Sequence, residues 1–416
     1  MAQYTLALRE VLVALGGALD FVGVDDLQHG KRVAVMAASC ARYAQWPEED
    51  CALLVALGLL HDCGVSSTRV HNRLVEEWDW RESQQHADRG AELLLESRLL
   101  SHLAEPVRYH HTHWCELKQL ALAEQTRRFA NLIFLVDRVD ALRAQHICTQ
   151  STVPPPEYWA ELIAPHAGQE FDPELYALFV SASANDAFWL QLAPDAVDDF
   201  LAEWAHAEGE VRVAFEDLLE LGFMFANIVD SKSPFTFSHS LGVKAVAGFL
   251  AECLQLPLEE RESVILAALL HDLGKLRVED HMLEKPGPYD EQERRLMHRH
   301  VFDTWQLLKR IHGFEHVARI AAMHHETLDG QGYPQRLGAV DLPRAARIVA
   351  IADVFQALVQ NRPYRSPMTL DAARDVMAQM VLRGKLDPQL VGVLFAHGEE
   401  AYQLARAHEA AVERQK

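Results

Sequence analysis

The sequence of 416 residues has few features of an exported or membrane protein. It contains six cysteines, none in a CxxC pair, and five of them fall in the first 150 residues without the spacing of a disulfide framework. Such cysteine usage is typical of a reducing cytosol. No run approaches the ~20 apolar residues that cross a bilayer, and the N-terminus lacks a basic segment followed by an apolar core. We therefore predict a cytoplasmic protein without a membrane anchor.

Basic residues are scarce relative to acidic ones. The chain has 39 Lys and Arg against 60 Asp and Glu, which gives a net charge of −21. Polymeric nucleic acid and anionic membrane surfaces attract proteins that carry a surplus of positive charge. The composition argues against non-specific binding to either, so an anionic ligand must be held by a local basic site.

Strand patterns are also few. Most segments place apolar residues at helical spacing, as in HSLGVKAVAGFLAECL, where Val246, Phe249, Leu250 and Cys253 mark one face. Clusters of Pro and Gly separate these segments. The apolar fraction of 49% is that of a globular protein with an ample core. The sequence therefore predicts an all-α fold.

The two halves of the chain share a pattern of histidine and aspartate. LLHDCG at 59–64 recurs as LLHDLG at 269–274, and the flanking histidines recur at equal distances. An interval of 32 residues separates His29 from His61 and His239 from His271, and an interval of 24 separates His86 from His110 and His300 from His324. Chance would not preserve two such intervals, so we predict two copies of one helical domain.

The repeat sets the predicted domain organisation. The first domain covers residues 1–185 and the second covers 226–416, with a helical linker over 186–225 and a connecting helix within 198–229. Two copies form a tandem pair and not a solenoid, which needs at least three repeats.

The second copy contains seven side chains that suit transition-metal ions. They are His239, His271, Asp272, His300, His324, His325 and Asp353. Five imidazoles and two carboxylates form a mixed nitrogen and oxygen set that suits Fe or Mn, and also Ni, Zn or Co, while the lack of thiolates argues against structural zinc. The alternative for any single histidine is a hydrogen-bonded core residue.

Seven ligands are too many for one ion, so we predict two divalent ions with Asp272 as the bridge. One ion would take His239, His271 and Asp353, and the other would take His300, His324 and His325. A binuclear centre of this kind deprotonates a bridging water at neutral pH and clamps both oxygens of an in-line phosphoryl displacement. Hydrolysis of a phosphoester is the expected chemistry.

The second copy resembles the HD-GYP family of bacterial phosphodiesterases, a branch of the HD phosphohydrolases. The resemblance is carried by SPFTFSHS, LLHDLGKLRVEDHMLEKPG, HHETLDGQGYP and IADVFQALVQNRPYRSPM. It implies an all-α fold with two or three metal ions, usually iron or manganese. It also implies hydrolysis of cyclic di-GMP to a linear dinucleotide, or of 3′,3′-cyclic GMP-AMP in some relatives.

The resemblance also implies roles for residues near the metal ligands. Asp272 and Lys275 would be catalytic, with Lys275 contacting the scissile phosphate, and Arg362 and Arg365 would bind phosphate oxygens. These three cations supply the local positive charge that an acidic protein needs for an anionic dinucleotide.

The loop Gly332, Tyr333 and Pro334 would shape the wall of the substrate pocket. By the same resemblance it would offer a surface to a protein partner, such as a GGDEF-type protein, and a homodimer is compatible with the family.

The first copy resembles a degenerate HD domain. Its matching set is His29, His61, Asp62, His86, His110, His111 and Asp137. Val65 stands at the position of Lys275, His146 and Thr149 stand at those of Arg362 and Arg365, and HTHWCELKQL replaces the glycine-rich turn. Three interpretations stay open: a metal-loaded regulatory or structural domain, a metal-free domain, and a second catalytic site.

Three classes of function fit this sequence. A cyclic dinucleotide phosphodiesterase accounts for the ligands, the loop and the cations. Another HD enzyme, either a nucleotide monoesterase or a di-iron oxygenase, accounts for the ligands alone. A non-catalytic interaction module would be expected to have lost ligands in the second copy, and none is lost. Metal identity, the preferred base, the input signal and the oligomeric state are left open.

Overall fold

The structure, a computed structural model, describes residues 3–23, 28–65, 67–78, 80, 82–149, 154–232, 239–361 and 366–407. The chain divides into two compact units, one of residues 7–211 and one that combines residues 1–6 with residues 212–416. We call them the N-terminal unit and the C-terminal unit. Residues 186–211 of the predicted linker cluster with the former and residues 212–225 with the latter.

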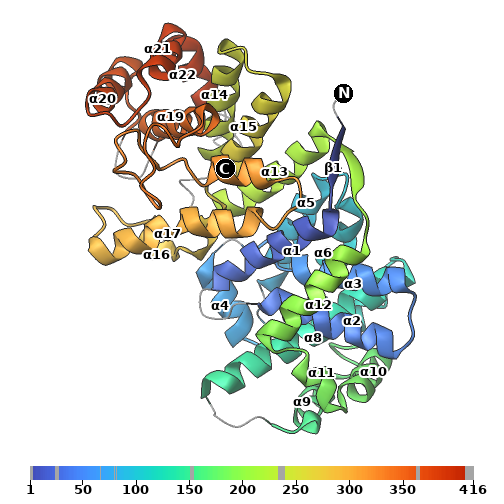
Figure 1. Cartoon of the computed structure of the whole chain (residues 1–416). Coiled ribbons are helices and arrows are strands. Elements are labelled where there is room, and N and C mark those ends of the chain that lie inside the picture. Colours follow the sequence, from blue (N-terminus) through green and yellow to red (C-terminus); the bar gives the residue numbers. More distant parts are fainter. Residues whose placement is uncertain are drawn as a thin grey trace. The chain divides into compact units, whose positions relative to one another are not determined.

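The predicted all-α class is confirmed (Figure 1). Within the described residues, the strands are β1 (Gln3–Leu6) and β2 (Val211–Ala214), which pair with each other in a two-stranded sheet. All other regular elements in the part of the chain that the structure describes are helical.

The helices of the N-terminal unit fall between these two strands in the sequence. The α-helices are α1 (Leu8–Leu19), α2 (His29–Tyr43), α3 (Glu48–Leu60), α4 (Thr68–Glu76), α5 (Ser83–Leu95), α6 (Ala104–Arg108), α7 (Trp114–Leu117), α8 (Glu124–Thr149), α9 (Pro156–Ile163), α10 (Pro173–Ser183), α11 (Asp186–Leu190) and α12 (Pro194–Ala207). Short 3-10 helices are η1 (Asp20–Gly23), η2 (Ser101–Leu103) and η3 (Ala164–His166).

The helices of the C-terminal unit follow β2. They are α13 (Phe215–Asp230), α14 (His239–Cys253), α15 (Leu258–Leu270), α16 (Asp280–Leu283), α17 (Glu291–Leu308), α18 (Glu315–Ala321), α19 (Arg344–Val359), α20 (Leu370–Leu382), α21 (Pro388–Ala396) and α22 (Gly398–Arg406), with the 3-10 helix η4 (Leu273–Arg277) after α15.

The prediction of one connecting helix within residues 198–229 is wrong. That segment contains the end of α12, then β2, and then most of α13. Gly209 follows the end of α12, and the alternating stretch VRVA that comes next places Val213 in the core. Alternation with a period of two suits a strand and not a helix, which explains the break.

The repeat predicted from histidine spacing is visible in the helices. α2 and α14 each have 15 residues and begin at His29 and His239, and α3 and α15 each have 13 residues. In each unit the pair packs together, α2 on α3 and α14 on α15. Of the apolar face predicted on α14, Val246 and Leu250 are fully buried.

One glycine in each copy lets a helix end approach a histidine backbone. A Cβ atom at Gly64 would lie 1.9 Å from the carbonyl oxygen of His86, and one at Gly274 would lie 2.0 Å from that of His300. No larger residue fits at these distances. The glycine of each HDxG motif therefore draws His61 and His271 close to the histidine helices α5 and α17.

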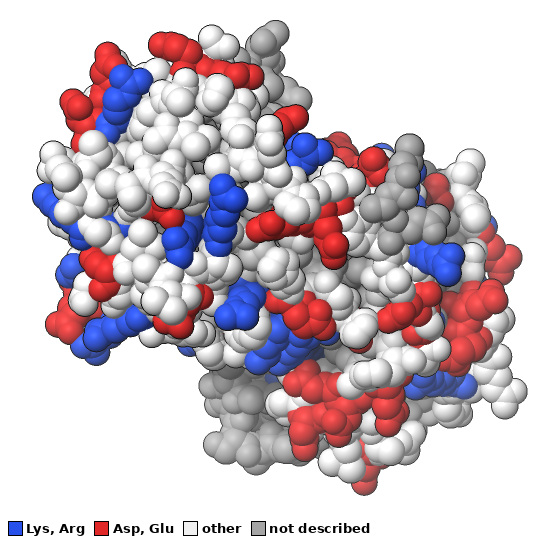
Figure 2. Space-filling model, turned by 45° about the horizontal axis from the view of Figure 1, so that its top comes forward, with Lys and Arg blue, Asp and Glu red and all other residues white. Residues whose placement is uncertain are grey.

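The surface reflects the excess of acidic residues. On the face drawn in Figure 2, Asp and Glu form contiguous patches, whereas Lys and Arg stand in smaller groups. Among the described residues on that face, no broad basic surface is available to a nucleic-acid polymer. A search of the described helices for a stretch sufficiently long and apolar to span a membrane finds none.

Candidate active site

The C-terminal unit brings all seven predicted metal ligands to one buried place. They come from five parts of the chain: His239 from the start of α14, His271 and Asp272 from the end of α15, His300 from α17, His324 and His325 from the turn after α18, and Asp353 from α19. Residues far apart in sequence thus meet because the helices pack with these positions turned inward.

The ligand atoms include the two predicted groups, and a third group of His271, Asp272 and His324 joins them. The donor atoms of His239, His271 and Asp353 lie within 4.8 Å of one another, and so do those of His300, His324 and His325.

Asp272 lies between these two groups. Its Oδ2 is 3.2 Å from Nε2 of His271, and its Oδ1 is 3.4 Å from Nε2 of His300. One carboxylate therefore faces both triads, which is the arrangement of a bridging ligand.

Hydrogen bonds to backbone carbonyls orient three of the imidazoles. Nδ1 of His271 donates to the carbonyl of Ala268 at 2.7 Å, and Nδ1 of His324 donates to that of Ala321 at 2.7 Å. Nδ1 of His300 pairs with the carbonyl of Met297 in the same way. Each acceptor stands three residues earlier in the chain, so these bonds fix the tautomer and leave Nε2 to face the centre.

The facing nitrogen atoms fit a metal ion. Nε2 of His300 and Nε2 of His324 lie 3.4 Å apart. Burial lowers the pKa of His300 to about 3 and that of His324 to about 4, so both rings are neutral and both Nε2 atoms carry a lone pair. Nε2 of His271 and Oδ1 of Asp272 are buried without a hydrogen-bond partner in the described structure. The unprotonated Nε2 lone pairs of His300 and His324 and the carboxylate of Asp272 converge here, and such a set of donors suits a bound cation.

The carboxylates of the centre are ionised. Burial alone would raise the pKa of Asp272, but His271 and Lys275 beside it lower that pKa well below its ordinary value. Burial likewise opposes the charge on Asp353, and the hydrogen bond from His239 lowers its pKa well below the ordinary value. Nζ of Lys275 contacts Oδ2 of Asp272, and its side chain is 21% exposed. Lys275, the cation predicted to bind phosphate, thus stands at the edge of the centre.

The glycine-rich loop closes directly over the end of the metal-ligand turn. A Cβ atom at Gly332 would lie 2.5 Å from the Cα atom of Glu326, so only glycine permits this approach. The Tyr333 amide donates to the carbonyl of His325 at 3.2 Å, and the buried Glu326 carboxylate accepts from the amides of Gln335 and Leu337. Pro334 is exposed beside them. Arg362 and Arg365, predicted to bind phosphate, lie outside the described residues.

The predicted ligands of the first copy also converge. The N-terminal unit holds one group of His29, His61 and Asp137 and a second group of Asp62, His86, His110 and His111, each with donor atoms within 4.8 Å of one another. Val65, which stands at the position of Lys275, is buried.

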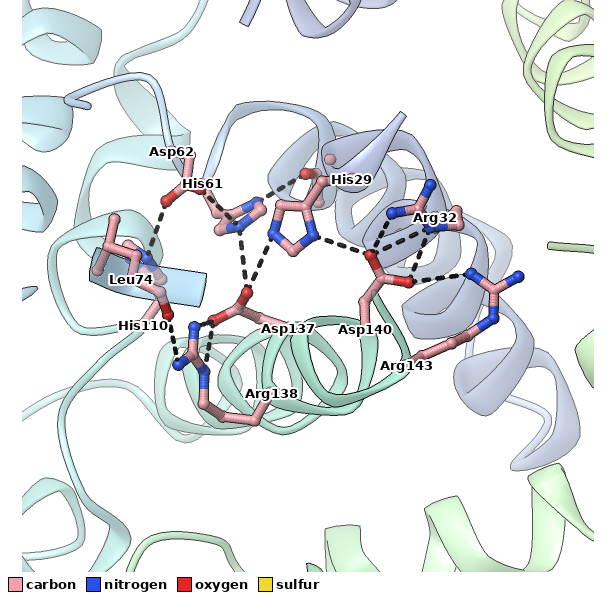
Figure 3. A network of polar contacts seen from close by, with 12 residues as sticks. His29, Arg32, His61, Asp62, Leu74, His110, Asp137, Arg138, Asp140 and Arg143 are labelled. Carbon is pink, nitrogen blue, oxygen red and sulfur yellow. Dashed lines mark hydrogen bonds and ion pairs between the residues drawn. The ribbon is translucent and has the colours of Figure 1, made fainter. Parts of the chain in front are cut away.

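The two copies differ in the polar groups behind the ligands. In the first copy, Nδ1 of His29 pairs with Oδ2 of Asp140 at 2.9 Å (Figure 3). In the second copy, Nδ1 of His239 pairs with the Gln360 amide oxygen at 3.1 Å. Burial lowers the pKa of His239; it would do the same for His29, but hydrogen bonds to Asp137 and Asp140 raise the pKa of His29 well above its ordinary value.

Sequence reasoning missed these supporting residues. Gln360 and Asp140 lie in or next to helices that carry a ligand, but nothing in the sequence shows which histidine they would reach. His298 was also missed; it stands two residues before His300 and stacks on Tyr333. A histidine that close to a predicted ligand was the one available signal.

Known proteins match the chain over both units. Models of the HD domain match residues 26–142 and residues 224–390. A protein of Vibrio cholerae named 3′3′-cGAMP-specific phosphodiesterase 1 is 38% identical over 97% of this chain and 95% of its own length. The cyclic di-GMP phosphodiesterase response regulator of Xanthomonas campestris is 45% identical over 36% of this chain and 40% of its own. A solved structure of a cyclic GMP-AMP specific phosphodiesterase of V. cholerae superposes with a TM-score of 0.64 at 26% identity and covers 95% of this chain and 98% of its own.

Two helical units with this order of His and Asp side chains define a tandem HD-domain protein. The chain belongs to the HD-GYP family of cyclic dinucleotide phosphodiesterases. The predicted enzyme class, a metal-dependent hydrolase of cyclic dinucleotides, is confirmed at the level of this family.

Proposed function

We propose that the C-terminal unit hydrolyses 3′,3′-cyclic GMP-AMP to a linear dinucleotide. The observation that carries this proposal is the position of Asp272, which faces both ligand triads while Lys275 contacts it from the solvent side. The choice of substrate is supported by the V. cholerae relative named for it, whose identity extends over 97% of this chain.

We propose two divalent ions as cofactors, with Fe or Mn as the first choice. Bound in pairs, such ions lower the pKa of a water molecule and offset the charge that develops on a phosphoryl group. The residues of the chain would hold these ions in a fixed arrangement. The carbonyl-bonded imidazoles of His271, His300 and His324 keep a fixed orientation, so little reorganisation is needed when substrate arrives.

Lys275 is proposed to bind the scissile phosphate. Its ammonium already faces the centre at Asp272, and its partial exposure lets it reach a phosphate oxygen. Arg362 and Arg365 are proposed as further phosphate contacts.

Cyclic di-GMP is the second candidate substrate, because the X. campestris relative named for it is 45% identical over 152 residues. The test is anaerobic purification with metal analysis, followed by identification of products from each dinucleotide in parallel. We expect faster turnover of 3′,3′-cyclic GMP-AMP. Faster turnover of cyclic di-GMP would reverse the assignment, and turnover of neither would overturn the proposed function.

A pair of matched variants tests the assignment of activity to residues 226–416. His271→Ala/Asp272→Ala should be inactive, whereas His61→Ala/Asp62→Ala should retain turnover. The reason is that Val65 leaves the first copy without the lysine proposed to bind phosphate. Circular dichroism checks that both fold. The reverse pattern of activity would place catalysis in the N-terminal unit.

The loop at Gly332–Pro334 is also proposed as a surface for a protein partner, such as a GGDEF-type protein. Its neighbours Gln331, Gln335 and Arg336 are exposed, and the Gln335 amide donates to the Glu326 carboxylate. Binding of a purified GGDEF domain to wild type and to Arg336→Glu, measured by calorimetry, tests this surface. Size-exclusion chromatography with light scattering tests the homodimer.

A further inference from the structure

In the N-terminal unit, a buried guanidinium occupies one oxygen of a predicted metal ligand. Arg138 donates to Oδ2 of Asp137 from Nε at 3.1 Å and from Nη2 at 2.9 Å (Figure 3). Its Nη1 donates to the carbonyl of Leu74 at 2.8 Å, which holds the guanidinium in place. Arg138 is only 4% exposed, so this ion pair lies out of water and is costly to break.

A second buried guanidinium stands behind the same centre. Nη2 of Arg32 lies 2.7 Å from Oδ2 of Asp140, and its Nε donates to Oδ1 at 2.8 Å. Asp140 in turn contacts Nδ1 of His29, whose Nε2 lies 3.1 Å from Asp137. Both carboxylates that flank His29 therefore already have an arginine partner.

The C-terminal unit has different residues at each of these positions. Val354 follows Asp353 where Arg138 follows Asp137, and Gln356 replaces Asp140. Gly242 replaces Arg32, and a Cβ atom there would lie 2.3 Å from the Gln356 amide. Both members of the Arg32–Asp140 ion pair are thus replaced in the other copy, Arg32 by glycine and Asp140 by glutamine.

Asp62 has a different environment from Asp137. Its ion-pair partners in the described structure are imidazoles, with Nε2 of His86 at 3.2 Å, of His61 at 3.5 Å and of His110 at 4.0 Å. Nδ1 of His110 donates to the carbonyl of Val107, so its Nε2 lone pair faces Nε2 of His86 at 3.3 Å. In the C-terminal unit the equivalent carboxylate, Asp272, has the Lys275 ammonium on one oxygen.

We propose that the N-terminal unit binds a single divalent transition-metal ion through Asp62, His86, His110 and His111, and that Arg138 excludes a second ion from His29, His61 and Asp137. Three imidazoles and one carboxylate complete the four-coordinate set of an ion such as Zn²⁺ and leave no open position for substrate. A dication bound to Asp137 would face the guanidinium across one carboxylate. Because the site is buried, water would screen the repulsion between the two positive charges only weakly. The ion would be structural or regulatory, and with no thiolate ligand the site would differ from the usual structural zinc site.

Metal counting in the full chain tests this proposal. His271→Ala/Asp272→Ala serves as the parent, so that the C-terminal centre contributes as little metal as possible. After loading with Zn²⁺ and dialysis, the bound zinc per chain is compared between this parent and the parent with His86→Gln/His110→Gln. We expect a difference of one ion. A difference of two, or of none, would overturn the proposal.

Arginine variants test the exclusion of the second ion. Two variants of the parent replace Arg138. Arg138→Val installs the residue of the other copy, and Arg138→Gln keeps hydrogen-bond donors without the charge. Each variant should bind one more Zn²⁺ than the parent. Arg143→Ala is the matched control, because Arg143 lies 3.7 Å from Asp140 and is 21% exposed, and its zinc content should not change. If the Arg138 variants fold but bind no more zinc than the parent, the role proposed for Arg138 is wrong.

Fluorescence supplies a readout that belongs to the N-terminal unit. Of the eight tryptophans, all but Trp305 lie within residues 7–211. Zn²⁺ should raise the denaturant midpoint followed by tryptophan emission in the parent, and should not raise it once His86 and His110 are replaced. An equal effect of Zn²⁺ on both proteins would contradict a site at these histidines, whether or not the Arg138 variants fold.

Discussion

The imidazole of His298 lies flat on the phenol ring of Tyr333, with ring centroids 3.6 Å apart and planes inclined by 8°. Tyr333 in turn packs on His325, with centroids 4.8 Å apart. His298 stands two residues before His300 on α17. One helix therefore supplies one candidate ligand directly and supports a second through the loop tyrosine.

Removal of this stack should loosen His325. A stacked aromatic pair contributes about 0.5–1.5 kcal/mol, so we expect His298→Ala to lower kcat by roughly threefold to tenfold and to weaken metal retention on dialysis. His298→Phe keeps a ring on Tyr333 and should stay near wild type. If the alanine and phenylalanine variants lose the same activity and metal, stacking is not the role of His298.

Asp272→Ala should abolish hydrolysis and release most of the metal from the C-terminal unit. The loss of the carboxylate between the triads would leave two cations facing each other without an intervening anion. Metal analysis and product formation are measured on the same preparation. Full turnover by a metal-depleted protein would rule out the binuclear centre.

Lys275→Ala should separate metal binding from rate. A charge-assisted contact made in the transition state is worth about 10²-fold to 10³-fold in kcat, whereas the ammonium is not a ligand and its loss should leave the metal content unchanged. Lys309→Ala removes an exposed lysine of the same unit and serves as the control. Wild-type kcat in the Lys275 variant would show that the phosphate is held elsewhere.

The stability of the N-terminal unit should fall as pH rises through the weakly acidic range. Burial raises the pKa of Asp20 from 3.8 to about 6, while its Oδ1 accepts from the Gly30 amide at 2.9 Å. An acid with a raised folded-state pKa favours the folded state only while it is protonated. Its effect is therefore largest below about pH 4 and is lost by about pH 6.

Asp20→Asn should remove this dependence and be more stable than wild type at neutral pH by up to about 3 kcal/mol, because two pKa units correspond to roughly that free energy. The free energy of unfolding is measured by tryptophan emission for both proteins at about pH 4 and about pH 7. A difference between the proteins that is the same at both pH values would mean that Asp20 stays ionised in the fold.

Much of the candidate site could be predicted because its histidines recur at equal sequence intervals in the two copies. Intervals of 32 and 24 residues between histidines recur in both copies, and only a repeated fold preserves them. The need for two ions also followed from ligand number, since one ion cannot hold all seven side chains, whereas the allocation of the ligands to each ion stays a prediction.

The remainder depends on contacts that no spacing reveals. Arg138 reads as an ordinary helix residue, and only the fold shows that its guanidinium turns back onto Asp137 and the carbonyl of Leu74. The pairing of QYTL with VRVA was equally hidden, because strands of four residues joined across about 200 residues carry almost no local signal.

The β1–β2 pair makes the N-terminal unit an insertion within the C-terminal one. Residues 3–6 cluster with the C-terminal unit, where the Tyr4 hydroxyl donates to the Glu262 carboxylate, and residues 7–211 leave this small sheet and return to it. On the ribosome, the first strand must therefore wait for its partner until the whole inserted unit has been synthesised. Any folding of the N-terminal unit during that delay would precede closure of the sheet, so the order of translation places completion of the C-terminal unit last.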